Sequence, residues 1–339
     1  MSDATKHAAV LAVDGGNSKT DVALVTADGR VLAVVRGPTT SHQQVGLEAG
    51  IDRLASLVAE VRSRAGLPAG APAAVGVYAL AGADSPGDIR RLTASIAARG
   101  LAGDGIVVND AFAPIRAGSE RAWGVALICG SGMNAAGIAP DGRRARLAAL
   151  GGISGDWGGG MDIGMAALGA AVRARDGRGR RTTLEAIVPA QFGFRRPLDL
   201  TNALEAGAIP ESRLRELSPA VFRAAGEGDA LARSIIDRLA DELVAMGGAI
   251  IRRLHLARRA PEVVMAGGIF NARDDAFEAR IAAGVHIVAP GATLRRLEAP
   301  PVLGAALLGL DRLDGPGKTE HRAEARLRAA LNGWEPAVL

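Results

Sequence analysis

One plan of strands and glycine loops occurs twice in the sequence, and this repeat constrains the fold more than any other feature. The first copy, LAVDGGNSKTDVALVTADGRVLAVV, begins at Leu11, and the second, VALICGSGMNAAGIAPDGRRARLAA, begins at Val125. Each copy has an apolar run, a polar glycine loop, a second apolar run, an Asp-Gly turn and a third run, which is typical of three consecutive strands. The repeat predicts two domains of one architecture; the alternative is a chance similarity of two hairpins.

Helical and extended patterns alternate along the rest of the chain, which predicts an α/β fold with mixed sheets and helices on their faces. In the first half we expect strands at 8–14, 20–26, 30–36, 73–80 and 105–108, and helices at 45–65 and 86–99. In the second half we expect strands at 122–128, 134–139, 144–149, 262–266 and 285–290, and helices at 229–256 and 300–310.

The length of 339 residues suits two domains rather than one core. We place the N-terminal domain at 1–115 and the C-terminal domain at 116–310, with a helical insertion at about 160–260 and a final helix or tail at 311–339.

Several classes of protein are not expected from the composition. No apolar run reaches the ~20 residues of a membrane span, and MSDATKHAAV lacks the apolar core of a signal peptide. The single cysteine, Cys129, excludes an intrachain disulfide and a four-cysteine metal site within one chain. We therefore expect a cytoplasmic protein that is not bound to a membrane.

The charge balance does not favour a nucleic-acid partner. The formal net charge is only +4, with both signs interspersed. The densest basic run, RARDGRGRR at 173–181, has no aromatic residue for base stacking. It is either a solvated loop or a site for an anion or partner.

The two glycine loops have the chemistry of a phosphate cradle. Glycines allow backbone N–H groups to converge on anionic oxygens. Asp14 ends the first strand, where its carboxylate suits a Mg²⁺ ion that accompanies a nucleotide. Ser18 and Thr20 offer hydroxyl groups, whereas Lys19 either adds charge or lies on the surface. A later segment, MAGGIFNA at 265–272, allows the close approach of a flat ligand, or is a structural turn.

These motifs together resemble a known family. The chain is similar to sugar kinases of the actin/hexokinase superfamily, in the branch of N-acetylglucosamine kinases and BadF/BadG/BcrA/BcrD ATPases. The matching motifs occur in order from about residue 8 to 310: DGGNSKT at 14–20, Asn109-Asp110, CGSGMN at 129–134, Gly155-Asp156 and AGGIF at 266–270. The resemblance implies two ribonuclease-H-like (actin-like ATPase) domains around a nucleotide cleft.

The resemblance also implies cofactors, a reaction and site residues. The protein would bind ATP and Mg²⁺. It would transfer the γ-phosphoryl group of ATP to the 6-hydroxyl of an amino sugar such as N-acetylglucosamine. Asp110 would be the catalytic base, although an aspartate at this place is alternatively a helix N-cap. Asp14 would hold the metal. The phosphate groups would contact Gly15, Gly16, Asn17, Ser18, Lys19, Thr20, Gly130, Ser131 and Gly132. Adenosine would contact Gly267, Gly268 and Phe270, and the sugar would contact Ser41, His42, Asp110, Ser131, Gly132, Asn134 and Asp156.

Three positions depart from the family pattern and concern the sugar. The sugar loop has Ser41-His42 where relatives carry Asn-His, and Leu150 lies near the place of a frequent tryptophan. Trp157 replaces the glutamate of the usual GDEGS, as GDWGGG. It either stacks on the sugar or fills space.

Two other functions remain as alternatives. One is a kinase for a different sugar: glucosamine, glucose or N-acetylmuramate. The other is a BadF-type ATPase that acts on a protein partner, although activators of that type bridge an iron–sulfur cluster with two cysteines from each subunit, and this chain has one. A sugar-sensing regulator would need a DNA-binding segment, which we do not expect here. The family resemblance also implies a homodimer.

Overall fold

The computed structural model describes residues 8–68, 70, 72–314 and 320–334. We expected no signal peptide in the N-terminal segment MSDATKHAAV, and residues 1–7 of this segment lie outside the described residues. Parts of the predicted C-terminal tail also lie outside them. The chain divides into two compact units. Unit 1 comprises Met1–Gly124, Pro140–Arg143 and Leu297–Leu339, and unit 2 comprises Val125–Ala139 and Arg144–Arg296. The domain boundaries expected from the sequence remain a prediction.

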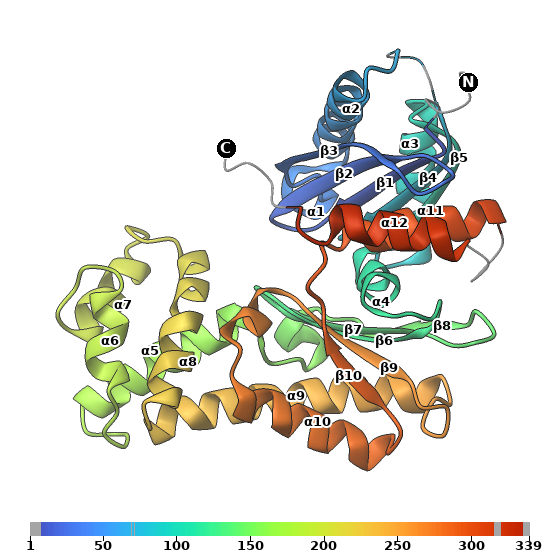
Figure 1. Ribbon diagram of the computed structural model, residues 1–339. Helices are drawn as coiled ribbons and strands as arrows, with labels where there is room; N and C mark the ends of the chain where they lie inside the picture. The colour runs from blue at the N-terminus through green and yellow to red at the C-terminus, as the bar shows by residue number, and fades with distance from the viewer. Residues whose placement is uncertain (1–7, 69, 71, 315–319, 335–339) are drawn as a thin grey trace. The chain divides into compact units, whose positions relative to one another are not determined.

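Unit 1 is built on a mixed five-stranded sheet (Figure 1). Its strand order is β3-β2-β1-β4-β5, with β1, β2 and β3 antiparallel and β1, β4 and β5 parallel. The parallel register aligns Gly15 with Leu80 and Leu80 with Asn109. Three loops therefore leave the sheet at the same edge. The strands are β1 (Val10–Gly15), β2 (Lys19–Val25), β3 (Val31–Pro38), β4 (Ala73–Leu80) and β5 (Ala102–Asn109).

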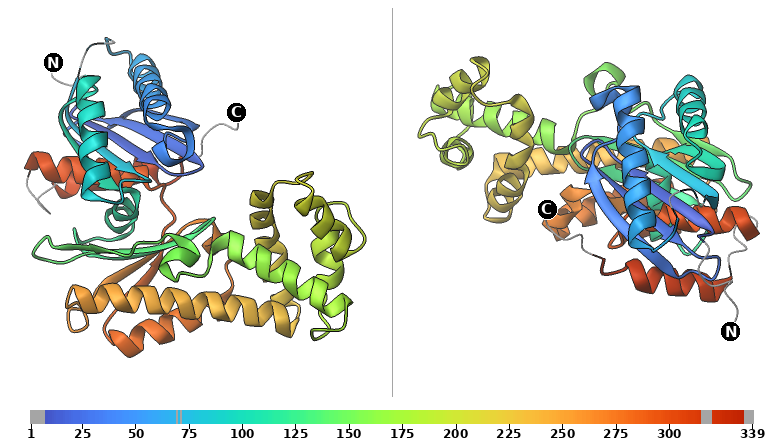
Figure 2. Two further views of the ribbon diagram at one scale, coloured as in Figure 1. Left: turned by 180° about the vertical axis from the view of Figure 1, so that it is seen from behind. Right: turned by 90° about the horizontal axis from the view of Figure 1, so that it is seen from above.

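Helices cover both faces of this sheet (Figures 1 and 2). Alternate residues such as Leu11 and Val13 pack with buried leucines, isoleucines and valines of α2 and α3 on one face. α11 packs on the opposite face, where Gly309 lies against Val10. The helices of unit 1 are α1 (His42–Val45), α2 (Leu47–Arg64), α3 (Pro86–Ala98), η2 (Asp110–Phe112), α4 (Ala113–Gly118), α11 (Val302–Asp314) and α12 (His321–Leu331).

A buried ion-pair cluster joins α12 to the rest of unit 1. The guanidinium of Arg116 is 3% exposed and pairs with Asp311 at 2.8 Å and with Glu324 at 2.8 Å. Arg328 donates hydrogen bonds to backbone carbonyls at the end of α4, among them that of Ser119 at 2.8 Å. Buried charges need such complete pairing, so the cluster ties the C-terminal helix to a defined place.

Unit 2 repeats the arrangement of unit 1. Its sheet has the order β10-β9-β6-β7-β8, with β6, β9 and β10 parallel and β7 and β8 antiparallel. Numbered from the first strand of each unit, both sheets have the same order. The repeated plan in the sequence therefore reflects duplicated architecture, as predicted. The strands are β6 (Gly124–Cys129), β7 (Met133–Ile138), β8 (Arg144–Arg146), β9 (Glu262–Ala266) and β10 (Thr293–Arg296).

The predicted helical insertion separates β8 from β9. α9 and α10 pack on each other, and α9 also packs on β7. The predicted helix at 229–256 is α9, with Asp229 as its N-cap. The helical segments of unit 2 are η3 (Gly151–Ser154), α5 (Gly159–Arg175), α6 (Leu184–Ala190), α7 (Pro197–Glu205), η4 (Glu211–Leu217), α8 (Ser218–Gly226), α9 (Ala230–Arg253), η5 (Gly268–Ala272) and α10 (Asp275–Val288).

Two predicted strands differ from the structure. The strand expected at 285–290 is wrong, because this segment is the end of α10, and the strand follows at Thr293–Arg296. Phe277, Ile281 and Val285 are buried at four-residue spacing, so the helical face outweighs the local β-branched residues. The strand expected at 144–149 is shorter and pairs only over Arg144–Arg146.

Candidate active site

Three segments meet at the carboxyl edge of the first sheet: two that the sequence predicted as part of the site and one that it did not. Parallel strands end at the same edge of a sheet, which is where α/β proteins place their ligands. Here the glycine loop follows β1, residues 81–84 follow β4, and Asn109-Asp110 closes β5. The structure therefore collects the candidate metal ligand and the candidate base within unit 1.

The first glycine loop is a tight turn with an exposed tip. The Gly16 N–H donates to the Lys19 carbonyl at 2.9 Å, and residues 17–19 are exposed. Gly15 is buried, and a Cβ there would lie 2.7 Å from Leu80 Cδ2. The glycine thus allows the loop to pack against the neighbouring strand end, while the backbone N–H groups of the exposed tip are accessible to an anion.

Thr20 connects this loop with the segment that precedes α1. Its buried hydroxyl lies 3.0 Å from Thr40 Oγ1 and accepts a hydrogen bond from the Thr40 N–H at 3.1 Å. Thr39 Oγ1 donates to the Gly16 carbonyl at 2.8 Å. Thr20, which we expected to contact phosphate, therefore holds the glycine loop and the sugar loop together in this structure.

Asp14 lies in a buried and electronegative environment. Burial, and after it the charges of Asp110 and Asp21, raise the pKa of its carboxyl to about 8, although Lys19 and Arg36 oppose the shift. Asp21 is the cross-strand neighbour of Asp14, and its two oxygens accept hydrogen bonds from Arg36 at 2.6 and 2.7 Å. A carboxylate in this surrounding is stabilised by a proton or by a cation.

Asn109 and Asp84 form a polar bridge beside Asp110. Asn109 Oδ1 accepts a hydrogen bond from the Ala111 N–H at 3.1 Å, so the side chain that caps η2 is that of Asn109, one residue before Asp110. Asn109 Nδ2 donates to Asp84 Oδ1 at 2.9 Å, and Gln43 Nε2 donates to Asp84 Oδ2 at 2.9 Å. Sequence reasoning missed Asp84, although an acid shortly after a buried strand at this edge is a usable signal.

Ser41 and His42 leave polar atoms without partners. Ser41 is 3% exposed, and among the described residues neither its Oγ nor His42 Nδ1 has a hydrogen-bond partner. His42 Nε2 lies 3.8 Å from Asp88 Oδ1, and the ring packs against Gly82, where a Cβ would lie 2.6 Å from Cε1. Buried polar atoms are normally satisfied, so these two atoms fit a ligand or ordered water.

In unit 2, the second glycine loop is fixed by the start of α5. The Gly160 N–H donates to the Gly130 carbonyl at 2.8 Å, and the Met161 N–H donates to the Ser131 carbonyl at 3.1 Å. Ser131 and Gly132 are exposed at the tip. Asn134 Oδ1 accepts a hydrogen bond from the Ala135 N–H at 2.8 Å. The loop is therefore held from behind, with its tip open.

Asp156 and Trp157 follow η3. The Asp156 N–H donates to the Gly151 carbonyl at 3.0 Å, and its carboxylate accepts a hydrogen bond from the Ser154 hydroxyl. The Trp157 ring stacks under the guanidinium of Arg238, whose Cζ is 3.9 Å from the ring centroid. The observed stacking partner of Trp157 is thus an arginine of α9, about 80 positions further along the chain, and no local pattern predicts this contact.

The predicted adenosine loop borders a pocket of about 430 Å³. A Cβ at Gly267, whose φ is +106°, would overlap the Cys129 carbonyl oxygen, so the strand end comes very close to the second glycine loop. Phe270 is 2% exposed and its ring packs on that of Phe277, so its side chain belongs to the core rather than to the pocket surface. The pocket is lined by Ser218, Pro219, Phe222, Arg223, Gly226, Gly268, Ile269, Asn271, Ala272, Arg273 and Asp274.

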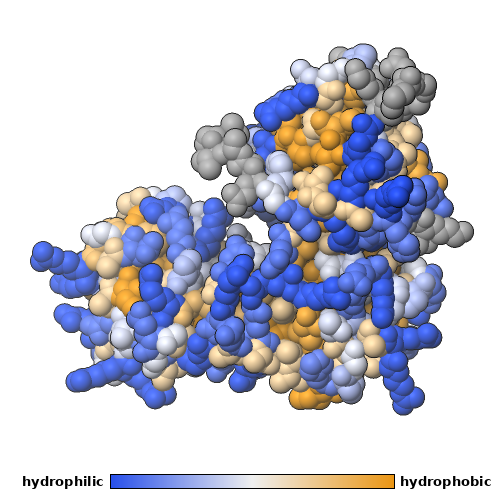
Figure 3. Space-filling view, in the orientation of Figure 1, coloured by the Kyte–Doolittle hydropathy of each residue, from blue (hydrophilic) through white to orange (hydrophobic). Residues whose placement is uncertain are grey.

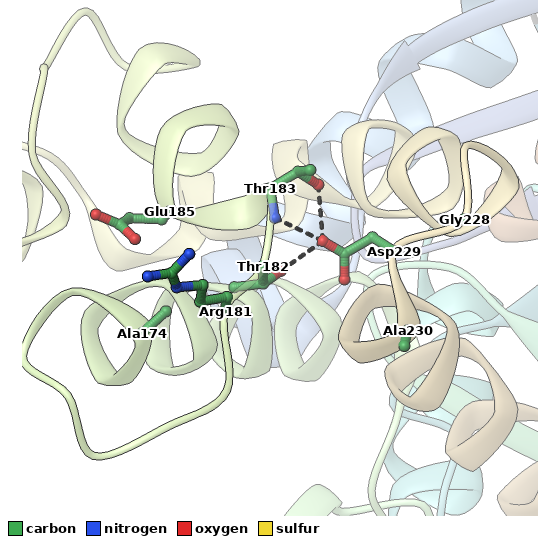
Figure 4. A pocket seen from close by; sticks show the side chains of 8 residues that line it. All are labelled: Ala174, Arg181, Thr182, Thr183, Glu185, Gly228, Asp229 and Ala230. Carbon is green, nitrogen blue, oxygen red and sulfur yellow. Dashed lines mark hydrogen bonds between the residues drawn. The ribbon is translucent and has the colours of Figure 1, made fainter.

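A second pocket lies in the helical insertion and has a structural explanation (Figure 4). It measures about 670 Å³, and Thr182, Thr183 and Asp229 line part of it. Both threonine hydroxyls donate to Asp229 Oδ2, at 2.7 and 2.8 Å. The bonds fasten the end of the 173–181 arginine run to the start of α9. Residues 175–181 of this run are exposed, as expected of a solvated loop. Hydrophilic side chains lie over much of the helical insertion on the face seen in Figure 3.

Among the described residues, no three His, Cys, Asp or Glu side chains gather as a metal-binding group. Over the same part of the chain, no helix has both the length and the apolar character needed to cross a membrane.

The comparisons with known proteins agree with these motifs. The model of the BadF/BadG/BcrA/BcrD ATPase family matches residues 11–309. An N-acetylmuramic acid/N-acetylglucosamine kinase from Clostridium acetobutylicum is 31% identical over 77% of this chain and 85% of its own. An N-acetyl-D-glucosamine kinase from Dictyostelium discoideum is 26% identical over 89% of this chain and 97% of its own.

A solved structure shows the same fold. It is that of a candidate N-acetylglucosamine kinase from Chromobacterium violaceum, with a TM-score of 0.69, 22% identity, and coverage of 90% of this chain and 99% of that one. The family model spans both repeated units and every motif described above. The chain therefore belongs to the BadF/BadG/BcrA/BcrD ATPase family.

Proposed function

We propose that this chain is an ATP-dependent sugar kinase that transfers the γ-phosphoryl group to the 6-hydroxyl of an amino sugar of the N-acetylglucosamine type. The observation that carries the proposal is the collection of Asp14, the Asp84–Asn109 bridge and Asp110 at one sheet edge. The two curated relatives, both kinases of N-acetylated amino sugars, support the acceptor class.

Asp110 is the proposed general base. The charge of Asp110 acts on the Asp14 carboxyl, which places the two acids in one electrostatic group. Phosphoryl transfer requires a positioned carboxylate for the acceptor hydroxyl and positive charge near the phosphate oxygens. The side chain that caps η2 is that of Asn109, so the N-cap role considered for Asp110 belongs to the residue before it.

Asp14 is the proposed contact for Mg²⁺. Its buried carboxyl, raised in pKa beside two other acids, fits a site that a divalent cation would neutralise. Mg²⁺ binds through one or two carboxylates together with water and substrate phosphates, so the lack of a larger acidic group among the described residues is compatible with it. When bound, the ion would neutralise charge on the phosphate oxygens.

The other residues have binding roles in the proposal. The backbone N–H groups of the two glycine loops, at 15–20 and 130–132, would hold the phosphates, and the 430 Å³ pocket beside Gly268 would hold adenosine. Ser41 Oγ and His42 Nδ1, which lack partners among the described residues, would contact the sugar together with Asn134 and Asp156. A homodimer, which the family resemblance implies, and a cytoplasmic location, which the composition leads us to expect, complete the proposal.

The test is release of ADP from Mg-ATP by the purified protein. It should be measured with N-acetylglucosamine, glucosamine, N-acetylmuramate, glucose and no sugar. We expect turnover that depends on an amino sugar and falls by about 10²–10⁴-fold in Asp110→Asn. Turnover that is independent of sugar would reject the kinase and favour an ATPase that acts on a protein partner.

A further inference from the structure

Arg238 of α9 presents its guanidinium group over the ring of Trp157, the residue after Asp156, with its Cζ 3.9 Å from the ring centroid. The side chain is exposed, and across the described residues it forms no hydrogen bond or ion pair. Glu242, one helical turn further along α9, forms no ion pair with it. A cation in this state is available to a ligand.

The segment that carries Asp156 is packed directly on α9 and on the second glycine loop. A Cβ at Gly158 would lie 2.7 Å from Leu239 Cδ1, the neighbour of the arginine on the helix. A Cβ at Gly159 would lie 2.5 Å from Gly132 Cα. Residues 158 and 159, which follow Asp156 at two and three positions, therefore pack on the middle of α9 and on the second glycine loop within unit 2.

Stacking on an aromatic ring prepares a guanidinium for a planar anion. The ring covers one face of the group and fixes its plane, while the N–H donors point outward along the edge. A carboxylate accepts two parallel hydrogen bonds from such an edge. An arginine held in this manner close in sequence and packing to Asp156, a residue of the proposed sugar site, is suited to a carboxylate on the same ligand.

We propose that Arg238 is a specificity-determining residue that binds a carboxylate substituent of the acceptor, so that acidic amino sugars are preferred over neutral ones. The inference rests on the proposed function, because it places the sugar at Asp156. Trp157 holds the guanidinium in orientation and acts as a positioning residue. No bond is formed or broken in this step; the arginine supplies charge and paired hydrogen bonds.

The test compares two acceptors that differ by one carboxylate-bearing ether, N-acetylmuramate and N-acetylglucosamine. In Arg238→Gln we expect kcat/KM for N-acetylmuramate to fall by about 10–100-fold, the effect of losing hydrogen bonds to a charged group. For N-acetylglucosamine we expect a change of less than about threefold. Arg238→Lys keeps the charge without the planar edge and should lose about half of the effect on a logarithmic scale.

Two further variants separate specificity from a general defect. Arg253→Gln removes an exposed arginine from the same helix, near its end, and should change neither acceptor. Trp157→Leu should raise the KM for N-acetylmuramate with a smaller effect on its kcat, because the guanidinium loses its support. Equal losses for both acceptors in Arg238→Gln would overturn the inference and leave a structural role.

Calorimetric binding distinguishes failure of the inference from failure of the proposed function. In the presence of Mg-ADP, wild-type protein should bind N-acetylmuramate, and Arg238→Gln should bind it about tenfold or more weakly. Phosphorylation of N-acetylglucosamine without binding of N-acetylmuramate would overturn the inference alone. No turnover with any sugar would reject the proposed kinase; binding of N-acetylmuramate that still depends on Arg238 would then support the anion site, and no binding would overturn both.

Discussion

The Asn109 side-chain amide donates a hydrogen bond to the Asp84 carboxylate at 2.9 Å, across the carboxyl edge of the first sheet. The second oxygen of the same carboxylate accepts from Gln43. One acid thus joins the residue before the proposed base to the segment that carries Ser41 and His42. Because both bonds end on Asp84, its side chain fixes the distance between the two parts of the proposed sugar site.

Replacement of Asp84 by Ala should weaken catalysis through the sugar. The buried Asn109 amide would lose its acceptor, at a cost of about 1–3 kcal/mol, so kcat/KM for the sugar should fall about 10–100-fold. The KM for ATP should change much less. Asp104→Ala, which removes an exposed acid of β5, the strand that ends in Asn109, together with its ion pair with Arg312, is the matched control. Steady-state kinetics would refute the prediction if both substrates were affected equally.

Asp14→Asn should stabilise the ligand-free protein while it abolishes turnover. The folded-state pKa of Asp14 is raised to about 8, so the folded state binds more protons than the unfolded state between the unfolded value of 3.8 and 8. The destabilisation from Asp14 is therefore absent at low pH and grows as pH rises through this window. Thermal unfolding should show a Tm gain of a few degrees for the variant at pH 8 and little gain at pH 4.

Asp21→Asn is the matched control for that experiment. It makes the same chemical change on the neighbouring strand, but it removes the partner of the Arg36 guanidinium, which Asp21 binds at 2.6 and 2.7 Å. Its Tm at pH 8 should fall rather than rise. A gain of stability in both variants, or in neither, would contradict the electrostatic account of Asp14.

Asp229→Ala should loosen the helical insertion. Burial raises the pKa of Asp229, but hydrogen bonds from the Ala232 N–H and the hydroxyls of Thr182 and Thr183 outweigh it and lower the pKa to about 2. The stabilisation is present above the unfolded value of 3.8 and is lost as pH falls toward 2. We expect a loss of about 1–2 kcal/mol in urea unfolding at pH 7, as for an N-cap.

The position of the damage provides a check on the Asp229 prediction. Limited proteolysis should cleave the variant faster within residues 176–183, because this loop is fastened to α9 by the lost bonds. Asp229→Asn keeps one acceptor oxygen and should lie between the wild type and the alanine variant. If the variant is less stable but is cleaved at the same rate within this loop, the Asp229 carboxylate stabilises α9 as its N-cap and does not hold the loop.

Gly267→Ala should destabilise the protein far more than Gly268→Ala. A methyl group at Gly267 would overlap the Cys129 carbonyl oxygen at a φ of +106°, whereas a Cβ at Gly268 would meet no atom within 4 Å. We expect a Tm loss of several degrees for the first variant and about one degree or less for the second. Similar Tm values for the two would show that the strand end can move away from the second glycine loop.

Local signals made much of the fold predictable. Apolar runs and Asp-Gly turns identified the hairpins of both units, and the helical pattern at 229–256 identified α9. The strand predicted at 285–290 was wrong because Val285 also lies on a helical face with Phe277 and Ile281. Burial of that face favours the helix over the strand. Short apolar runs are ambiguous in this way until their packing is known.

The sequence by itself determined the repeated architecture, the family and the positions of the glycine loops, because these depend on residues close together along the chain. Only the tertiary structure decided that Asp84 reaches Asn109, that Thr20 bonds to Thr40 and that Arg238 stacks on Trp157. Each of these contacts joins distant segments through the alignment of strands or the packing of a helix against a loop. Such alignment depends on the summed burial of many side chains, and no short stretch of sequence contains it.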